Sequence, residues 1–167
     1  VHLLMAFFIL SLIYWNYLSL KKFTLSNNKL NRSFSIIFLF LLFCQILIGA
    51  FVSGMDAGKI YNSWPLMGSN YFPDDNLVMN LFSLNAFNDP SLVQFIHRNL
   101  AYLILFFYLI ILFMIYKRNI SNYFNIIKII GFLLILQIIL GIFTLLYGAQ
   151  IFIASLHQIS SIFLISS

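Results

Sequence analysis

Three histidines are the side chains of this 167-residue chain best suited to bind a metal. His2, His97 and His157 each lie near the start of an apolar segment, and the sequence contains no other histidine. An ionisable side chain inside an apolar membrane segment is expensive to bury without a partner, so it marks a candidate functional site. A single such histidine is ordinarily explained by a hydrogen bond to a backbone carbonyl or a lipid headgroup. Three at similar positions favour a shared function.

Two imidazoles without nearby thiolates or carboxylates indicate haem rather than zinc. Zinc sites usually add Cys, Asp or Glu ligands, whereas the single cysteine, Cys44, has no CxxC partner and all four acids fall within residues 54–93. A haem iron needs only two axial ligands, and histidine is a common one. In an antiparallel bundle the third and fifth segments are diagonal and parallel, so His97 and His157 would face each other across the core. The pattern predicts a bis-histidine haem site.

The elements that position these histidines are membrane helices. Hydrophobic residues make up 62% of the chain and charged residues 8%, compared with about 25% charged in a typical soluble domain. These proportions exclude a disordered tail, a soluble globular enzyme and a disulfide scaffold. A membrane helix takes about 20 residues, which leaves room for four or five spans and no extramembrane domain. We expect an all-α fold, a polytopic transmembrane helix bundle.

The distribution of charge predicts the topology of five apolar segments. The first four are long enough to span and the fifth is shorter; they cover roughly 3–20, 33–53, 94–116, 127–147 and 150 to the end. Basic residues cluster in the linker 21–32 and at Lys117 and Arg118, whereas every acid lies in the 54–93 loop. The positive-inside rule therefore places both basic linkers in the cytoplasm or matrix and the loop outside. The net charge of +5 is explained by topology, and no nucleic-acid partner is expected.

The loop 54–93 is much longer than a usual connection, which is typical of a functional loop. Its part from Leu77 to Phe87 is apolar enough for a short helix in the membrane interface. Together with Trp64, this part is a candidate lid over the site. The alternative is a surface loop anchored by Trp64.

A short sequence repeat predicts that a two-helix unit is used twice. Residues 45–49 read QILIG and residues 137–141 read QIILG, and each is followed by a segment that carries a histidine near its start. Coincidence in an apolar background is the alternative. Gln45 and Gln137 are expected to form hydrogen bonds between helices, and Gly49 is expected to allow close helix packing.

Two polar residues near the histidines are candidates for binding the haem propionates. Arg98 directly follows His97, and arginine binds carboxylates bidentately. Asn62 in the outer loop is expected to donate a hydrogen bond to a propionate. A snorkelling arginine at a helix start is the alternative for Arg98.

Four motifs in this chain resemble those of the heme A synthase family. Residues 45–58 (QILIGAFVSGMDAG) and 61–67 (YNSWPLM) resemble the family signature. Residues 95–98 (FIHR) with Ala101 and Tyr102 resemble the next element, and residues 137–145 and 156–158 resemble the last two. The motifs follow the family's order with compatible spacing, and the resemblance covers essentially the whole chain.

The resemblance implies which part of a larger protein this sequence represents. Members of the family have eight spans in two four-helix halves, each half with two histidines. Residues 1–32 then correspond to the fourth span and its linker, and residues 33–167 to the C-terminal haem-binding half. His97 and His157 are implied to ligate a haem b cofactor, and His2 the haem O substrate. The glutamate and the other histidine of the N-terminal half are missing from this sequence, so no catalytic residue is assigned.

The resemblance also implies the reaction and the compartment. The family oxidises the C8 methyl group of haem O to the formyl group of haem A for cytochrome oxidase assembly, using an electron donor. Haem O synthase or the missing N-terminal half are implied partners, besides the lipid membrane. The lack of loop cysteines implies the alphaproteobacterial or mitochondrial type, in the bacterial cell membrane or the mitochondrial inner membrane. The alternatives are a bis-histidine membrane cytochrome without its own catalysis and an inactive fragment.

Overall fold

The computed structural model describes the backbone of residues 2–20 and 30–167, and the side chains of residues 5–20 and 30–167. The described chain is all-α and contains no strand, as predicted. It has five α-helices: α1 (His2–Leu20), α2 (Arg32–Gly54), α3 (Pro90–Lys117), α4 (Phe124–Leu146) and α5 (Ile151–Ile165). Four short 3-10 helices connect them: η1 (Ala57–Lys59), η2 (Val78–Phe82), η3 (Leu84–Asn88) and η4 (Ser121–Tyr123).

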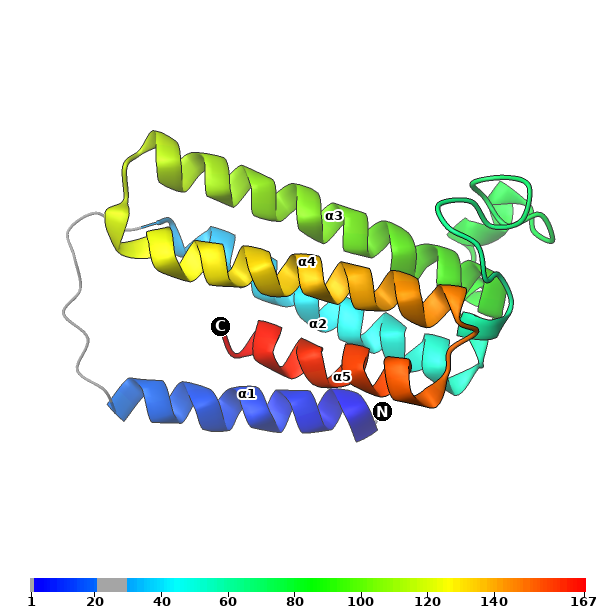
Figure 1. Cartoon of the computed structure of the whole chain (residues 1–167), viewed down its shortest axis with the longest axis horizontal. Helices are drawn as coiled ribbons and strands as arrows, with labels where there is room; N and C mark the ends of the chain where they lie inside the picture. Colours follow the sequence, from blue (N-terminus) through cyan, green and yellow to red (C-terminus); the bar gives the residue numbers. More distant parts are fainter. Residues whose placement is uncertain (1, 21–29) are drawn as a thin grey trace.

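The helices form an antiparallel bundle in which α1, α3 and α5 run in one direction and α2 and α4 in the other (Figure 1). The most extensive helix pairings join α2 to α3 and α4 to α5. The 54–93 loop lies at the end where α1, α3 and α5 begin (Figure 1). The predicted two-helix unit is therefore present twice, once on each side of the bundle.

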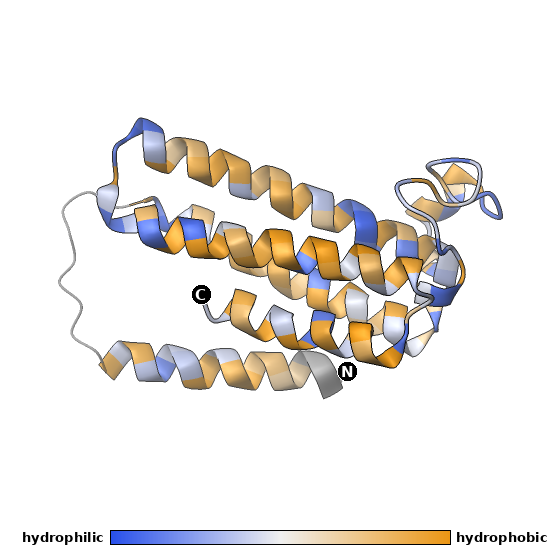
Figure 2. Ribbon diagram, in the orientation of Figure 1, coloured by the Kyte–Doolittle hydropathy of each residue, from blue (hydrophilic) through white to orange (hydrophobic). Residues whose placement is uncertain are grey.

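Three of the described helices are long and apolar enough to cross a membrane, namely α2, α3 and α4, the last counted from Ser121. Residues Met5–Leu20 of α1 and all of α5 form shorter apolar helices. Hydrophilic residues collect mainly at the two ends of the bundle and in the loops (Figure 2). Many large apolar side chains on the helices are exposed, as expected for a surface that lipid covers. That residues 3–20 also span remains a prediction.

Local sequence signals set where the histidine-bearing helices begin. Asp89 caps α3 by accepting a hydrogen bond from the backbone N–H of Leu92 at 3.0 Å, and Pro90 occupies the first helical turn, where its missing N–H is not needed. His97 consequently lies about two turns into α3. The α4–α5 turn uses left-handed backbone at Gly148 (φ 64°) and Ala149 (φ 56°), which reverses the chain within a few residues. This short turn holds α5 against α4.

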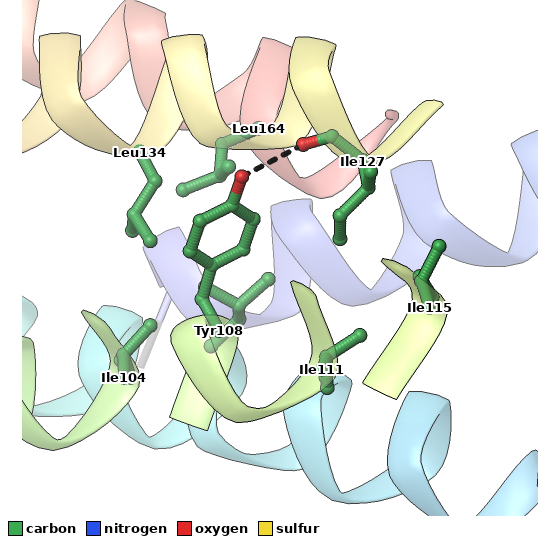
Figure 3. Close-up of a cluster of buried hydrophobic side chains, with 8 residues drawn as sticks. Ile104, Tyr108, Ile111, Ile115, Ile127, Leu134 and Leu164 are labelled. Carbon is green, nitrogen blue, oxygen red and sulfur yellow. Dashed lines mark hydrogen bonds between the residues drawn. The ribbon is translucent and has the colours of Figure 1, made fainter. Parts of the chain in front are cut away.

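A cluster of buried side chains joins α2, α3, α4 and α5 on the side of the histidines that faces away from the 54–93 loop. Tyr108 of α3 points across to α4 and donates a hydrogen bond to the carbonyl oxygen of Ile127 at 3.0 Å (Figure 3). The other members are aliphatic; they are Leu42, Ile104, Ile111, Ile115, Ile127, Leu134 and Leu164. This cluster forms the end of the cavity described next that faces away from the 54–93 loop. Four residues belong to both, namely Leu42, Ile104, Leu134 and Leu164.

Candidate functional site

A cavity of about 550 Å³ lies within the four-helix part of the bundle and is lined by residues of α2, α3, α4 and α5. This volume falls in the range of about 300–1,000 Å³ typical of cofactor and small-molecule sites. Aliphatic residues line much of the cavity, and the larger polar residues of the lining include Gln45, Gln94, His97, Arg98, Gln137 and His157. The tertiary structure thus brings the predicted pair, His97 and His157, to one cavity from two different helices.

Each histidine is held by a glutamine of the neighbouring helix. Gln45 Nε2 of α2 donates a hydrogen bond to the backbone carbonyl oxygen of His97 at 3.1 Å. Gln137 Nε2 of α4 makes the same bond to the carbonyl oxygen of His157 at 2.9 Å. Both glutamines were predicted to form hydrogen bonds between helices, and that prediction is confirmed.

The glycine of each repeat lies against the imidazole of the same histidine. A Cβ atom at Gly49 would lie 3.2 Å from His97 Cε1, and one at Gly141 would lie 3.1 Å from His157 Cε1. Both distances are tighter than ordinary van der Waals contact, so any larger residue would press on the ring. Each copy of the Gln-x-x-x-Gly repeat therefore provides a glutamine that bonds to the backbone of one histidine and a glycine that leaves room for its imidazole ring.

One ring nitrogen of each imidazole has no hydrogen-bond partner within the described part of the chain. The Nδ1 atom of each ring is buried and has no hydrogen-bond partner among the described residues. Buried polar atoms normally have a partner, so these two are unusual. Within residues 5–20 and 30–167 no group of three or more His, Cys, Asp or Glu side chains could hold a metal ion. Two imidazoles in an apolar cavity fit the axial positions of a haem better than a tetrahedral zinc site.

Arg98 connects the cavity to the 54–93 loop. Its guanidinium donates hydrogen bonds to the carbonyl oxygens of Tyr61 at 3.0 Å, Ser63 at 3.0 Å and Leu66 at 3.3 Å. The Nε atom is buried and has no partner among the described residues. No ion pair joins Arg98 to a carboxylate in the described part of the chain, where the ion pair present is Lys59–Asp56 at 2.7 Å.

The side chain of Asn62 bonds within the protein, and its predicted contact with a haem propionate stays a prediction. Its side-chain amide donates to the carbonyl oxygens of Gly58 at 3.0 Å and Leu145 at 2.8 Å. These bonds join the first part of the 54–93 loop to the end of α4. Asn62 is not among the described residues that line the cavity.

The predicted lid divides into two parts. Trp64 lines the cavity, and its indole N–H donates to the hydroxyl of Tyr102 at 2.9 Å. Residues 77–87 form η2 and η3 instead of one short helix, and none of them lines the described cavity. Most of their large apolar side chains are exposed, including Phe82 at 81% and Leu84 at 86%. The segment does not cover the cavity, and its place in the membrane interface stays a prediction.

The 54–93 loop contains carboxylates that accept several hydrogen bonds. Asp75 accepts from Ser91 Oγ at 2.6 Å and from the Tyr61 hydroxyl at 3.0 Å. Partial burial opposes ionisation of Asp75, but the hydrogen bonds from Ser91, Tyr61 and Asn76 outweigh it, and its pKa lies below the ordinary value. The backbone N–H of Ser69 and the side chain of Asn70 lower the pKa of Asp74 in the same way.

His2 is the remaining predicted site residue. α1 begins at His2, but its side chain lies outside the described residues. The basic residues Lys21, Lys22 and Lys29 of the first linker lie outside them as well. The proposed role of His2 therefore stays a prediction.

Two residues of the site were missed in the sequence. Gln94 is 2% exposed, lines the cavity, and donates to the carbonyl oxygen of Tyr61 at 3.2 Å. Ser160 donates a hydrogen bond to the side-chain oxygen of Gln137. The helical periodicity holds the signal for both, because residues three or four apart share a helix face. Gln94 precedes His97 and Ser160 follows His157 by that spacing.

Comparison with known proteins agrees with the geometry. The family model described as "Cytochrome oxidase assembly protein" matches residues 1–167. The chain belongs to this family. A protein named "Heme A synthase" from Pelagibacter ubique is 43% identical over 167 residues, which cover 100% of this chain and 49% of that relative.

Two further relatives named "Heme A synthase" show the same pattern. The Rickettsia felis protein is 40% identical over 83% of this chain and 41% of its own length. The Ruegeria pomeroyi protein is 40% identical over 96% of this chain and 44% of its own length. The predicted resemblance is confirmed, and the chain spans about half the length of these relatives. No solved structure gives a significant match.

Proposed function

We propose that this chain supplies the haem b site of a heme A synthase, with His97 and His157 as the two axial ligands. The observation that carries the proposal is that both imidazoles line one apolar cavity and each keeps a buried ring nitrogen without a partner. Histidine pairs of this kind are common axial ligands of haem iron. The family membership and the relatives' printed name support the same assignment.

The residues around the histidines have separate tasks in this proposal. Gly49 and Gly141 leave room for the imidazole rings, and the aliphatic residues of the lining offer an apolar surface to the macrocycle. Arg98 offers its unpartnered Nε–H and a positive charge to a haem propionate, an interaction that arginine geometry favours. Asn62 contributes by fixing the loop to α4, beside its proposed contact with a propionate. Bound haem would supply a redox-active iron, which is chemistry the protein side chains lack.

The activity of the whole protein is proposed from the family. We infer that it oxidises the C8 methyl group of haem O to the formyl group of haem A for cytochrome oxidase assembly, with electrons from a donor. His2 is the proposed ligand of the haem O iron. Haem O synthase and an N-terminal half are the proposed protein partners. The proposed location is the bacterial cell membrane or the mitochondrial inner membrane, with the 54–93 loop on the outer side.

A reduced-minus-oxidised visible spectrum of the purified chain tests the haem site. We expect a low-spin b-type signal that is lost in His97→Ala and in His157→Ala. Gln158→Ala is the matched control, because Gln158 lines the same cavity next to His157. A folded, detergent-soluble chain without haem, or an unchanged spectrum in either histidine variant, would contradict the proposal.

A haem-binding module without catalysis of its own is the second candidate. The same cavity supports it, because it contains the histidine pair, and no group of three or more His, Cys, Asp or Glu side chains among the described residues could hold a further metal ion. Conversion of added haem O to haem A by the reduced chain would exclude this candidate. A chain with a normal b-type spectrum and no conversion, even with a donor present, would favour it.

A further inference from the structure

In both glutamine–histidine pairs, Gln45–His97 and Gln137–His157, the glutamine donates to the backbone carbonyl oxygen of the histidine. The second contact of the glutamine differs between the pairs. We propose that Gln45 is a positioning residue for the imidazole ring of His97, whereas Gln137 positions only the backbone of His157. The proposal rests on the proposed haem site for its functional meaning. Its structural basis is independent of haem, because it concerns contacts within the protein.

The second contact of Gln137 locks its amide group away from the ring. Its Oε1 accepts a hydrogen bond from the hydroxyl of Ser160, and its Nε2 donates to the carbonyl oxygen of His157 at 2.9 Å. The Ser160 hydroxyl also lies 2.9 Å from the same carbonyl oxygen. Both ends of the Gln137 amide are therefore occupied by partners other than the imidazole.

The second contact of Gln45 is with the ring itself. Its Nε2 lies 3.3 Å from His97 Nε2, in addition to donating to the carbonyl oxygen of His97. Its Oε1 is buried and has no partner among the described residues. The residue three positions after His97 is Leu100, which has no hydroxyl group to occupy that oxygen. The serine at the matching position of the other pair is the reason the two amides behave differently.

This contact selects where His97 carries its proton. An N–H of Gln45 that donates to Nε2 needs a lone pair there, so the neutral imidazole carries its proton on Nδ1. The reverse orientation of the amide would place Oε1 against the carbonyl oxygen of His97, where the Nε2 donor now lies, so it is disfavoured. Gln45 thus sets the tautomer and orientation of the His97 ring in the haem-free chain. It also occupies the Nε2 lone pair that an iron would need, so haem has to displace this contact, whereas Gln137 leaves the ring of His157 free.

The first test needs no haem and uses the full chain in detergent with ¹⁵N-labelled histidine. Gln45→Met and Gln137→Met are a matched pair that removes each amide while keeping its length. With the imidazoles neutral, we expect Gln45→Met to move the ring-nitrogen shifts of His97, identified by their loss in His97→Asn. Gln137→Met should leave the ring shifts of His157 in place. Unchanged His97 shifts in Gln45→Met, or equal ring shifts in both variants, would overturn the proposal.

A second variant keeps the test decisive if Gln45→Met fails to fold. Gln45→Glu retains an oxygen that accepts a hydrogen bond from the ring but removes the N–H donor. We expect it to shift the population of His97 toward the tautomer with its proton on Nε2. A folded Gln45→Glu chain with the same His97 tautomer as the unsubstituted chain would overturn the proposal.

Haem titration separates this proposal from the proposed function. We expect Gln45→Met to raise the affinity for haem, because the amide that occupies the His97 lone pair is gone, and Gln137→Met to retain the original affinity. A chain that binds no haem contradicts the haem b site, while the histidine shifts still decide the role of Gln45. Equal haem affinities in the two variants would contradict the role of Gln45 and leave the haem site standing.

Discussion

The phenol of Tyr108 reaches from α3 into α4 and donates a hydrogen bond to the carbonyl oxygen of Ile127 at 3.0 Å. The ring fits there because residue 131, one turn further along α4, is glycine, and a Cβ atom at that position would collide with the Tyr108 hydroxyl and ring. The pair is part of the buried cluster that forms the end of the cavity facing away from the 54–93 loop. The spacing of α3 and α4, about three helical turns beyond His97, therefore depends on the absence of a side chain at Gly131.

Gly131→Ala is expected to destabilise the bundle by about 1–3 kcal/mol, because the new methyl group overpacks a filled site. Thermal unfolding in detergent, followed by circular dichroism, measures the effect. Gly54→Ala is the matched control, since a Cβ atom there would meet nothing within 4 Å. Tyr108→Phe in the Gly131→Ala background should recover part of the loss, because it removes the closest atom. Equal midpoints for Gly131→Ala and Gly54→Ala would contradict this account.

Gly49→Ala and Gly141→Ala are expected to lower haem affinity by about tenfold or more, a size typical of changes that displace a ligand through its surroundings. Each methyl group would press on the Cε1 atom of its histidine. Haem-to-protein stoichiometry, measured by pyridine haemochrome at fixed added haem, checks the expectation. Gly54→Ala again serves as control. Full haem occupancy in both glycine variants would show that these glycines do not position the ligands.

Arg98→Lys is expected to release the 54–93 loop, because lysine keeps the charge but cannot bond three separated carbonyl oxygens. Cleavage within residues 61–76 by a broad-specificity protease should rise at least about tenfold, which corresponds to ~1.4 kcal/mol for opening. Arg118→Lys is the control, because Arg118 is exposed just after the opposite end of α3. A cleavage rate equal to that of the unsubstituted chain would contradict the role of Arg98 as a loop anchor.

Acidification is expected to loosen the 54–93 loop. The pKa of Asp75 in the folded loop lies below its ordinary value of 3.8, since the hydrogen bonds to the ionised form outweigh partial burial. The carboxylate therefore stabilises the loop fully above about pH 3.8, and this contribution is lost as the pH falls through the folded pKa. The emission of Trp64 in a Trp15→Phe background reports the change. Asp75→Asn should weaken the acid transition, and adding Asp74→Asn should weaken it further; an unaltered transition would contradict the assignment.

Cysteine labelling tests the proposed orientation in the membrane. In a Cys44→Ala background, Asn85→Cys in η3 should react in intact spheroplasts with a maleimide that cannot cross the membrane. Asn122→Cys, between α3 and α4, should react only after the membrane is opened, because the basic linkers face the inside. Asn85 and Asn122 are both exposed, so a difference in labelling would report the side of the membrane and not the burial of the side chain. The reverse pattern would overturn the orientation.

The sequence by itself determined the class of fold, the helix positions and the candidate ligands. A high apolar fraction forces helices because backbone groups inside a membrane must bond within their own segment. The caps Asp89 and Pro90, and the spacing of QILIG and QIILG, are local signals that can be read without a structure. His97 and His157 were predicted from their positions near the starts of apolar segments, and their two glutamines were predicted from the repeat. Composition also predicted that residues 77–87 would be apolar and exposed to the interface.

The tertiary structure decided which partners these residues have. Arg98 binds loop carbonyls and Asn62 bonds the end of α4, because the loop folds back over α3 and α4 through contacts distant in sequence. The difference between Gln45 and Gln137 also appears only in three dimensions, since it depends on Ser160 reaching an amide on another helix. Sequence periodicity specifies which face a residue occupies, but the packing of neighbouring helices determines the atom it meets.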